Sequence, residues 1–368
     1  MTVGFFSPLP PAKTGVADYA EALLHALQKH GDVKVGEPDA DVALYHIGNN
    51  QLHAAIYDRA LAVPGVVVLH DAVLQHFFLG RLTRQQYVDE FIFNYGEWSR
   101  SSAEDLWKHR ARSAADPRTF AWPMLKRIAT TARAIVVHNP AAGRIVRQHA
   151  PEARVIEIPH LFVPPQTPPE VDTLRFRREL GLAPRTLFVG LFGHQRESKR
   201  LPVVLRALER VWASGGVNQT DTRLLIAGSF ASSDLERALK TRLPDPRILR
   251  AGYLPDADFW RYAAAIDLCV NLRYPTAAET SGIAIRLMGI GKPVVFSDGA
   301  EIARIPENAC LRVDTGPAEE ELLASYIAWL SRDREAGEEI GRRAAAHIAS
   351  HHGLETVASL YWDELKKT

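Results

Sequence analysis

The sequence predicts an α/β protein made of two doubly wound units, each a parallel sheet covered by helices. Short apolar runs rich in β-branched residues alternate with segments of helical period along the 368 residues. The runs are apolar throughout rather than at every second position, which is typical of parallel strands buried on both faces. A stretch with four prolines and no periodicity, residues 162–172, separates two such series. We therefore expect a semi-rigid linker between two sheets.

Five runs in the first half are predicted strands. The spacing from Ala20 to Leu27, between the first two runs, is that of a helix with one apolar face. Residues 71–128 have helical patterns and many aromatic side chains but no convincing strand. They form either a helical layer over the sheet or an insertion that shapes a pocket or docks a partner. The five runs are VGFF (3–6), VALYHIG (42–48), VVVLH (66–70), AIVVHN (134–139) and VIEIPH (155–160).

Six further runs in the second half are also predicted strands. The helical spacing recurs from Leu201 to Leu208 and from Val357 to Leu365. We expect a first domain over residues 1–165, a second over 166–352 and a C-terminal helix at about 353–368. The six runs are TLFVGLFG (186–193), RLLIAGS (223–229), RILRAGY (247–253), DLCVNL (267–272), PVVF (293–296) and CLRV (310–313).

Composition argues against several classes of protein. The net charge of +1 gives no overall field that would favour nucleic acid or an acidic membrane. No apolar run approaches the roughly 18 residues of a membrane span, and the N-terminus lacks the pattern of a signal peptide. The two cysteines, Cys269 and Cys310, lie in apolar surroundings far apart in the sequence. We therefore expect reduced core thiols in a cytoplasmic protein, and neither a disulfide framework nor a zinc site.

The residues that follow each run are the candidates for a site, because ligands of open α/β sheets bind beyond the carboxyl ends of the strands. After the first run, a Pro/Gly loop of residues 7–15 leads into a helix. Gly15 would allow close backbone approach, and the free amides of the helix start favour an anion. Asp18 in the first turn competes for the same positive end. The loop is thus either a phosphate cradle or a simple capped helix.

Histidines end four of the runs in the first half. His70 ends the third run, where it could donate a hydrogen bond to a hydroxyl or shuttle a proton. It could equally be a structural histidine, with Asp71 as a helix cap. His46, His138 and His160 occupy similar places, so position alone does not single out His70.

Two segments of the second half combine charge with a predicted helix start. Arg196, Lys199 and Arg200 lie between a strand and a helix, which suits a diphosphate, although a solvated basic loop would have the same sequence. Glu279 precedes three small residues, 280–282, at the start of another helix. Its carboxylate could accept hydrogen bonds from sugar hydroxyls while the following amides hold an oxygen atom. The helix dipole alone could also favour a glutamate there.

Taken in order, these segments resemble the retaining GT-B glycosyltransferases of family 4 (glycosyl transferases group 1). The matching segments span nearly the whole chain, and those of the C-terminal half are the more specific. The resemblance implies two Rossmann-like domains that face a central cleft. It also implies a hexosyltransferase that moves a sugar from a nucleotide-diphosphate donor, with UDP- and GDP-sugars expected first, to an acceptor hydroxyl in glycan, glycolipid or polysaccharide biosynthesis. The segments are PLPPAKTGVADY, VVVLHD, AIVVHNPAAGRIV, IEIPH, LFGHQRESKRLPVVLRAL, LLIAGS, AGYLPDADFWRYAAAIDLCVNL and ETSGIAIRLMGIGKPVVFSD.

The resemblance also implies roles for individual residues. Lys199 matches the lysine that binds the donor diphosphate, with Arg196 in place of the basic residue expected just after the strand. Gly15 matches the glycine loop near that phosphate, and Glu279 and His70 match residues near the transferred sugar. No metal is expected, because basic residues and helix starts neutralise the diphosphate, and the last helix is expected to cross back to the first domain. The remaining matches are the donor-site residues Thr280, Ser281 and Gly282, and Ser229 and Tyr253, where the nucleoside packs.

One departure from the family pattern concerns the nucleotide. A second glutamate, which holds the ribose hydroxyls, would fall at Arg286 or Leu287, and neither residue is acidic. Two alternatives to a glycosyltransferase therefore stay open. One is a GT-B epimerase or phosphorylase, and the other is a non-catalytic protein that binds a nucleotide sugar or a partner. The acceptor, a glycan, lipid-linked or small molecule, is expected at residues 9–15 and 71–128. The arginines and lysines of that helical stretch either face solvent or lean on the inner face of a membrane.

Overall fold

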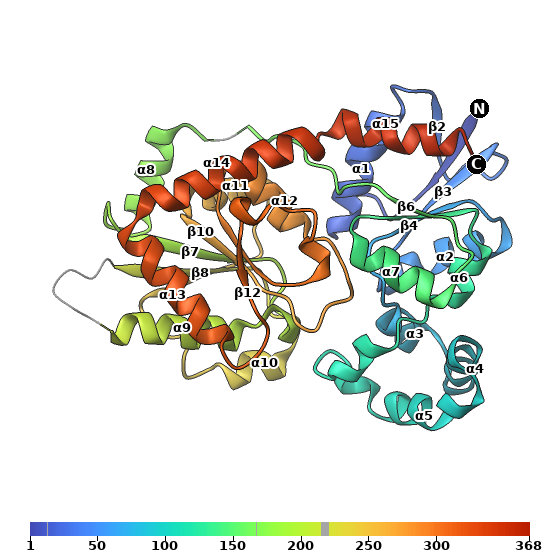
Figure 1. The fold of residues 1–368 in the computed structure, drawn as a ribbon, viewed down its shortest axis with the longest axis horizontal. Helices are drawn as coiled ribbons and strands as arrows, with labels where there is room; N and C mark the ends of the chain where they lie inside the picture. The colour runs from blue at the N-terminus through green and yellow to red at the C-terminus, as the bar shows by residue number, and fades with distance from the viewer. Residues whose placement is uncertain (13, 167, 215–220) are drawn as a thin grey trace.

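The computed structural model describes residues 1–12, 14–166, 168–214 and 221–368 and contains two six-stranded parallel sheets flanked by helices (Figure 1). Lys13, in the loop after the first strand, and Thr167, in the expected linker, lie outside these residues. Successive side chains of the central strands enter different apolar cores. In the first sheet, Tyr45 packs on one face and Leu44 on the other. Burial on both faces is the physical reason for the continuous apolar runs.

The first sheet has the strand order β2-β1-β3-β4-β5-β6, and five of its strands are those that the sequence predicts. The prediction misses β2, because DVKV carries two charges and buries only Val33 at the edge of the sheet. The strands are β1 (Thr2–Phe6), β2 (Asp32–Val35), β3 (Val42–Ile47), β4 (Val66–Leu69), β5 (Ala134–Val137) and β6 (Val155–Glu157). The helices are α1 (Gly15–Leu27), α2 (Ala54–Ala62), α3 (Gln75–Arg81), α4 (Arg84–Tyr95), α5 (Arg100–Lys108), α6 (Lys126–Thr131) and α7 (Pro140–His149).

The helical stretch of residues 71–128 packs on one face of the first sheet. Phe77, Tyr87 and Phe91 are fully buried in the same core as Tyr45 of β3. This packing supports a helical layer, whose α4 and α5 form the lower lobe in Figure 1. Most of the arginines and lysines that the sequence places on this stretch are engaged. Arg81, Arg84 and Arg100 pair with Asp58, Glu104 and Glu97, and Arg110 lies over the ring of Trp107.

The second sheet has the order β12-β11-β10-β7-β8-β9, and all six of its strands are predicted ones. The linker is more ordered than its prolines suggest, because α8 begins at Glu170 and Phe162 is buried in a core of the second sheet. The strands are β7 (Leu187–Phe192), β8 (Thr222–Ala227), β9 (Ile248–Gly252), β10 (Leu268–Asn271), β11 (Val294–Ser297) and β12 (Leu311–Val313). The helices are α8 (Glu170–Glu179), α9 (Leu201–Ala213), α10 (Ser233–Ala238), α11 (Asp256–Ala265), α12 (Gly282–Gly289), α13 (Glu319–Arg332) and α14 (Arg334–His351).

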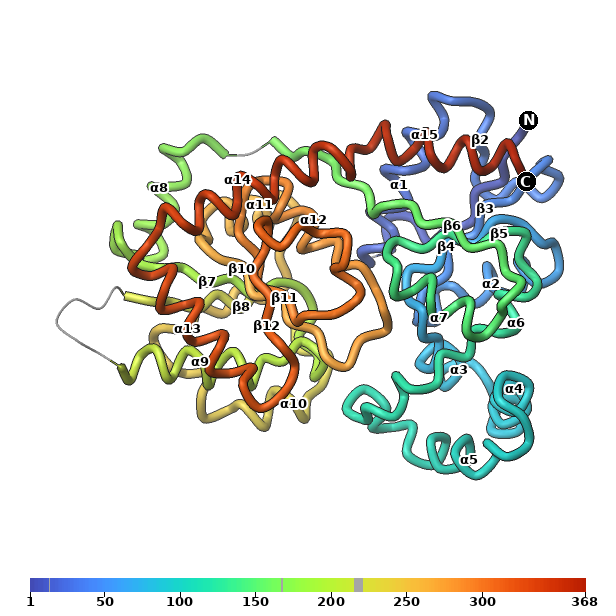
Figure 2. Tube along the Cα trace, in the orientation of Figure 1, coloured from blue at the N-terminus to red at the C-terminus, as the bar shows by residue number. Residues whose placement is uncertain are grey.

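The chain passes between the sheets twice, and the two passages lie side by side (Figure 2). The amide of Phe162 donates to the carbonyl of His352 (2.7 Å) where they meet. After Gly353, α15 (Leu354–Leu365) returns to the first sheet and lies along α1. The hydroxyls of Tyr19 and Tyr361 are hydrogen-bonded there at 2.9 Å. The last helix, which follows the helices of the second sheet along the chain, thus packs into the core of the first sheet.

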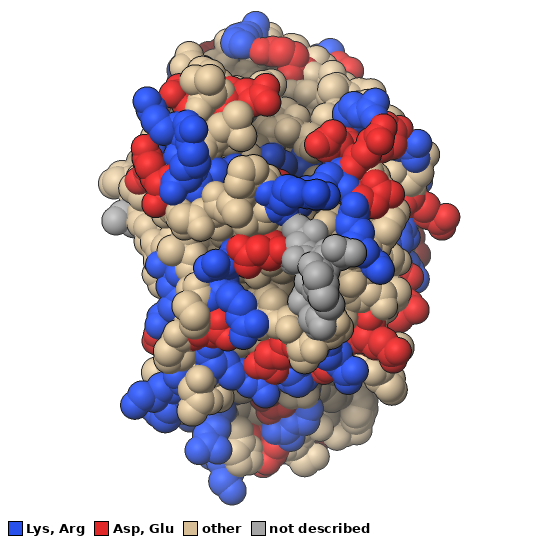
Figure 3. Space-filling model, turned by 90° about the vertical axis from the view of Figure 1, so that its left-hand side faces the viewer, with Lys and Arg blue, Asp and Glu red and all other residues tan. Residues whose placement is uncertain are grey.

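On the face of the molecule drawn in Figure 3, basic and acidic side chains are mixed and neither charge dominates. Cys269 and Cys310 are both buried free thiols, as the sequence predicts. Among the helices of the described residues, none combines the length and apolar character needed to cross a membrane.

Candidate functional site

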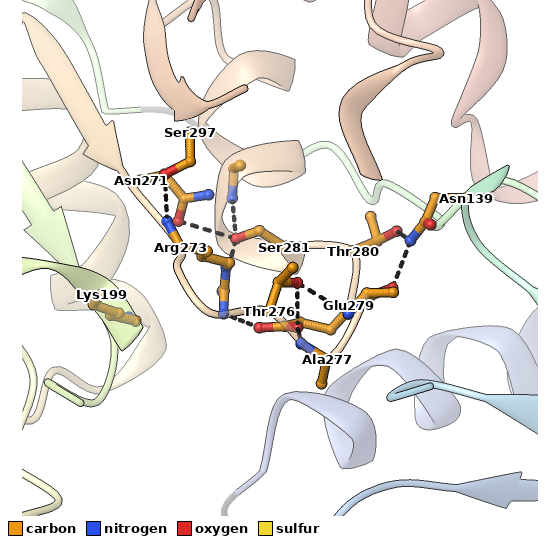
Figure 4. A network of polar contacts seen from close by, with 12 residues as sticks. Asn139, Lys199, Asn271, Arg273, Thr276, Ala277, Glu279, Thr280, Ser281 and Ser297 are labelled. Carbon is orange, nitrogen blue, oxygen red and sulfur yellow. Dashed lines mark hydrogen bonds and ion pairs between the residues drawn. The ribbon is translucent and has the colours of Figure 1, made fainter. Parts of the chain in front are cut away.

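The carboxyl ends of the two sheets meet at the loop between β10 and α12. Asn139, which caps α7 after β5, donates from Nδ2 to the carbonyl of Ala278 (2.8 Å). The amide of Ala72, after β4, donates to the carbonyl of Ala277 (2.7 Å). The loop that carries Glu279 is therefore held from both sheets (Figure 4).

Glu279 is bound within its own loop. Its Oε1 accepts from Nη1 of Arg273 (2.6 Å), and its Oε2 accepts from the hydroxyl of Thr276 (3.1 Å) and the amide of Ala277 (2.8 Å). Because α12 begins only at Gly282, Glu279 lies before the helix. Hydrogen bonds inside the loop, rather than the helix dipole, therefore account for the place of this carboxylate.

Arg273 connects this loop to the start of α12. Its Nη2 donates to Oγ of Ser281 (3.2 Å), and the same oxygen accepts from the amide of Ala284 (3.3 Å) as the N-cap of the helix. Ser281 in turn donates to Oδ1 of Asn271 (3.1 Å). Thr280 is fixed from the first sheet by Nδ2 of Asn139 (3.0 Å). The predicted residues 279–282 thus form one junction, organised by an arginine that the prediction did not include.

Lys199 is buried at the end of β7. Its ammonium group donates to the carbonyl of Phe192. Burial, followed by the positive charges of Arg273 and Arg196, lowers the pKa of Lys199 to about 7. Three cations, those of Arg196, Lys199 and Arg273, therefore lie near the carboxylate of Glu279, and Arg196 and Arg273 also act on the carboxyl group of Asp71. A bound anion would favour the charged form of Lys199 and complete the balance of charge.

The two arginines on either side of Lys199 differ in their surroundings. Arg196 is exposed, has no ion pair within the described part of the chain, and its charge acts on Lys199 and on Asp71 of the first sheet. Arg200 has a left-handed backbone (φ 60°) and is paired with Glu319. Arg196 is therefore available to a ligand, whereas Arg200 is engaged with α13.

Gly15 starts α1, with Thr14 as its N-cap accepting from the amide of Ala17 (3.1 Å). A Cβ atom placed on Gly15 would meet no atom within 4 Å. The fold itself therefore does not require glycine at this position, and the space in front of it is open. Asp18, in the same first turn, has a raised pKa because it is partly buried, and Arg286 opposes the shift.

His70 belongs to a cluster of four histidines around Tyr19. The ring centroids of His46, His70, His138 and His160 lie 4.8 to 6.0 Å from that of Tyr19. Nε2 of His70 lies 3.0 Å from Nδ1 of His46. Burial lowers the pKa of all four, so the cluster is neutral near pH 7. The structure thus brings together the four strand-end histidines that the sequence could not rank.

Asp71 is not the helix cap considered from the sequence. Its Oδ2 accepts from the amide of Asn49 (2.8 Å), while α3 begins further along the chain. Burial and the charge of Glu279 raise the pKa of Asp71 to about 6, and Arg196 and Arg273 oppose this shift. Asp71 therefore faces the charged loops of the second sheet. Asp71 and Arg273 both directly follow an apolar run, which is the signal by which the sequence could have included them.

Ser229 and Tyr253 follow β8 and β9, on the side of β7 away from β10. The carbonyl of Ser229 accepts from the amide of Gln195 (2.9 Å), which brings its loop against the one that leads to Lys199. The side chain of Tyr253 is 59% exposed. Both residues lie at the carboxyl edge of the second sheet, and Tyr253 offers an exposed ring on which a base could stack.

The two positions at which a second glutamate would fall are occupied differently. Leu287 is fully buried in the core beneath α12. Arg286 lies over the rings of Phe259 (4.0 Å) and Trp260 (4.2 Å) and pairs with Asp256. Neither side chain offers an acceptor for ribose hydroxyls, so a nucleoside bound here must find its partners elsewhere.

A cavity of about 310 Å³ adjoins the loop on the side of β11. Its lining includes Asn271, Arg273, Glu279 and Phe296. The Nδ2 atom of Asn271 is buried and has no partner among the described residues. Within residues 1–12, 14–166, 168–214 and 221–368, no group of three or more His, Cys, Asp or Glu side chains could hold a metal ion.

Comparison with solved structures identifies the architecture. The structure of Anabaena HepE in complex with UDP-glucose superposes with a TM-score of 0.68 at 16% identity, and the match covers 100% of both chains. The chain has the GT-B fold. Sucrose-phosphate synthase from Thermosynechococcus elongatus matches as well, with a TM-score of 0.68, 16% identity and 100% of both chains covered. WaaG, a glycosyltransferase involved in lipopolysaccharide biosynthesis, has a TM-score of 0.61 at 15% identity over 99% of both chains.

Sequence comparison adds a family match for part of the chain. Residues 183–333 match the family described as glycosyl transferases group 1. This segment extends from β7 to α13 and includes Arg196, Lys199, Arg273 and Glu279. No functionally curated protein matches the sequence significantly. The match therefore concerns the sheet of the GT-B fold that carries the cations of the site.

Proposed function

We propose that the protein is a retaining glycosyltransferase that takes a sugar from a nucleotide-diphosphate donor. The observation that carries this proposal is the gathering of Arg196, Lys199 and Arg273 beside Glu279, where the two sheets meet. A diphosphate brings the negative charge that these cations lack, and arginine and lysine bind it by charge-assisted hydrogen bonds. Such fixed charges also stabilise the diphosphate as it leaves the sugar, which is where the transition state needs them.

The donor is proposed to be a UDP-sugar before a GDP-sugar. The HepE structures contain UDP-glucose or UDP, which supports UDP for this chain because the two folds superpose over their full lengths. The three cations would neutralise the diphosphate without a metal. Glu279, His70 and the amides of residues 280–282 would contact the sugar, Gly15 the phosphates, and Ser229 and Tyr253 the nucleoside. Retention of anomeric configuration is proposed from the family resemblance.

The acceptor is proposed to bind on the side of the first sheet, within residues 1–165, with the donor in residues 166–352. Closure of the two parts about the linker would exclude water from the reaction. Because Arg81, Arg84 and Arg100 are already paired with carboxylates, the helical stretch is better suited to face solvent than to bind an anionic membrane. A lipid-linked acceptor and a cytoplasmic location stay predictions from the sequence.

The experiment that tests the proposal begins with thermal unfolding in the presence of UDP, GDP, ADP and dTDP. A ligand at 100 times its dissociation constant should stabilise the protein by about 2.7 kcal/mol. The nucleotide that does so is then offered as nucleotide sugars with a panel of hydroxyl acceptors. We expect an α-linked product from an α-linked donor, read by the anomeric proton coupling in NMR. An inverted product would contradict retention, and no shift with any nucleotide would contradict the donor site.

The burial of Leu287 favours one second candidate, a GT-B protein that binds a nucleotide sugar or a partner without transferring the sugar. Such a protein would show no turnover with any acceptor, and one that binds only a partner would also show no thermal shift with any nucleotide. An epimerase would convert the nucleotide sugar without an acceptor, and a phosphorylase would require free phosphate. Incubation of the nucleotide sugar alone, with acceptor and with phosphate separates the three outcomes.

A further inference from the structure

The histidine cluster contains a hydrogen bond that determines what His70 can do. His46 is fully buried in β3, and its Nδ1 lies 3.0 Å from Nε2 of His70. Burial lowers the pKa of both rings well below the usual value, and the neighbouring histidines lower it further. Each ring is therefore neutral near pH 7 and carries one N–H. One of the two facing nitrogens donates, and the other accepts.

The surroundings of His46 indicate which nitrogen donates. Its other nitrogen, Nε2, is buried without a hydrogen-bond partner among the described residues. If the proton were on Nε2, a buried donor would be left unsatisfied and Nδ1 would have to accept from His70. With the proton on Nδ1, the unpaired Nε2 of His46 is an acceptor. Unsatisfied acceptors are better tolerated in protein interiors than unsatisfied N–H donors.

Two neighbouring histidines show the same pattern where the donor is unambiguous. Nδ1 of His138 lies 3.0 Å from the carbonyl of Ile158, and Nδ1 of His53 lies 2.8 Å from the carbonyl of His46. A carbonyl can only accept, so both rings carry the proton on Nδ1. In both rings Nε2 is buried and has no hydrogen-bond partner in the part of the chain that the structure describes. This part of the fold therefore already holds histidines in the Nδ1–H form.

We propose that His46 is a positioning residue that holds His70 in its Nδ1–H form, so that His70 acts on a substrate as a hydrogen-bond donor and not as a base. Nδ1 of His46 donates to Nε2 of His70, which places the single proton of His70 on its own Nδ1. That Nδ1 has no hydrogen-bond partner among the described residues, and His70 is partly buried where it directly follows β4 at the carboxyl edge of the sheet. The role toward a sugar hydroxyl rests on the proposed function, whereas the proton position does not.

The proton position is tested directly by NMR on the full chain without substrate. Ring nitrogens of ¹⁵N-histidine-labelled protein are observed at pH 7.5, and His70 is assigned by the signals that disappear in His70→Gln. We expect the Nδ1–H form of His70 in the wild type. An Nε2–H form, or a charged ring, would overturn the proposal. This result stands whether or not the protein proves to be a transferase.

The positioning role is tested by two variants of His46. His46→Leu removes the donor, so His70 should shift toward the Nε2–H form and kcat should fall about tenfold, the value of one hydrogen bond lost in the transition state, with little change in KM for the donor. His46→Asn keeps an amide N–H near the place of Nδ1 and should restore both readouts. An unchanged His70 spectrum and kcat in His46→Leu would contradict the role. If His46→Leu does not fold, the wild-type spectrum and His46→Asn decide the matter.

Discussion

The guanidinium of Arg273 binds the carboxylate of Glu279 at 2.6 Å and thereby joins the loop after β10 to the start of α12. This pair has two consequences. The carboxylate is held in one orientation beside Ser281, and the remaining charge of the arginine lies close to Lys199. Arg273 therefore connects the part of the site suited to a sugar with the part suited to a diphosphate.

Replacement of Arg273 by alanine should weaken nucleotide binding strongly. Loss of charge-assisted hydrogen bonds worth about 1.5–3 kcal/mol corresponds to a rise in Kd of roughly 10- to 150-fold, measured by titration calorimetry with UDP. Arg342→Ala is the matched control, because Arg342 is exposed on α14 and pairs with Glu339. An unchanged Kd in Arg273→Ala would exclude this residue from the anion site.

Lys199 should make nucleotide binding depend on pH. Because the pKa of Lys199 is lowered to about 7 in the free protein, the ammonium group is lost above that pH, and a diphosphate must then bind together with a proton. The affinity for UDP should fall from pH 7 to pH 9 in the wild type. In Lys199→Met it should be weak and nearly independent of pH over that range. Calorimetry in two buffers of different ionisation enthalpy measures the proton uptake, and none at pH 8 would contradict the prediction.

The lowered pKa of Lys199 also makes the free energy of unfolding depend on pH, and this dependence runs in the direction opposite to that of nucleotide affinity. The pKa of Lys199 lies below its usual value of 10.5, so between about pH 7 and 10.5 the unfolded chain binds more protons than the folded one. The contribution of Lys199 to the free energy of unfolding therefore rises through this window. Urea unfolding at several pH values should show a shallower rise for Lys199→Met than for the wild type.

Gly15→Ala should separate ligand binding from folding. A Cβ on Gly15 meets no protein atom within 4 Å, so the thermal midpoint of the free protein should be unchanged or slightly higher. A donor phosphate held against the backbone would lose its close approach, and we expect at least about a tenfold loss of affinity for the nucleotide sugar. Equal affinity in wild type and variant would show that this loop does not touch the donor.

Leu287→Glu should not create the ribose contact that the family resemblance implies for this part of α12. Leu287 is fully buried among apolar side chains, so a carboxylate there would have to be desolvated without a partner. We expect a loss of more than about 3 kcal/mol in the free energy of unfolding, measured in urea. Leu287→Met is the control and should cost less than about 1.5 kcal/mol. A stable Leu287→Glu with tighter UDP binding would show that α12 turns this position toward the ligand.

Most of the strands could be predicted because parallel strands buried on both faces leave an unmistakable apolar run. The edge strand β2 could not, since an edge strand with one buried side chain lacks that pattern. The same limit applies to the site. Lys199 and Glu279 could be named because each lies in a segment between a predicted strand and a predicted helix. The sequence gives no sign that Arg273 binds Glu279 across six residues.

The sequence by itself determined the α/β class, the two series of strands and the strand ends on which a site could form, because burial and helical period are local properties of a chain. Only the tertiary structure decided which of those ends meet. It placed Asp71 of the first sheet opposite the loop of Glu279, gathered four histidines around Tyr19, and turned Leu287 into the core. These contacts depend on how two sheets are oriented and closed by α15, and periodicity along one chain carries no information about that orientation.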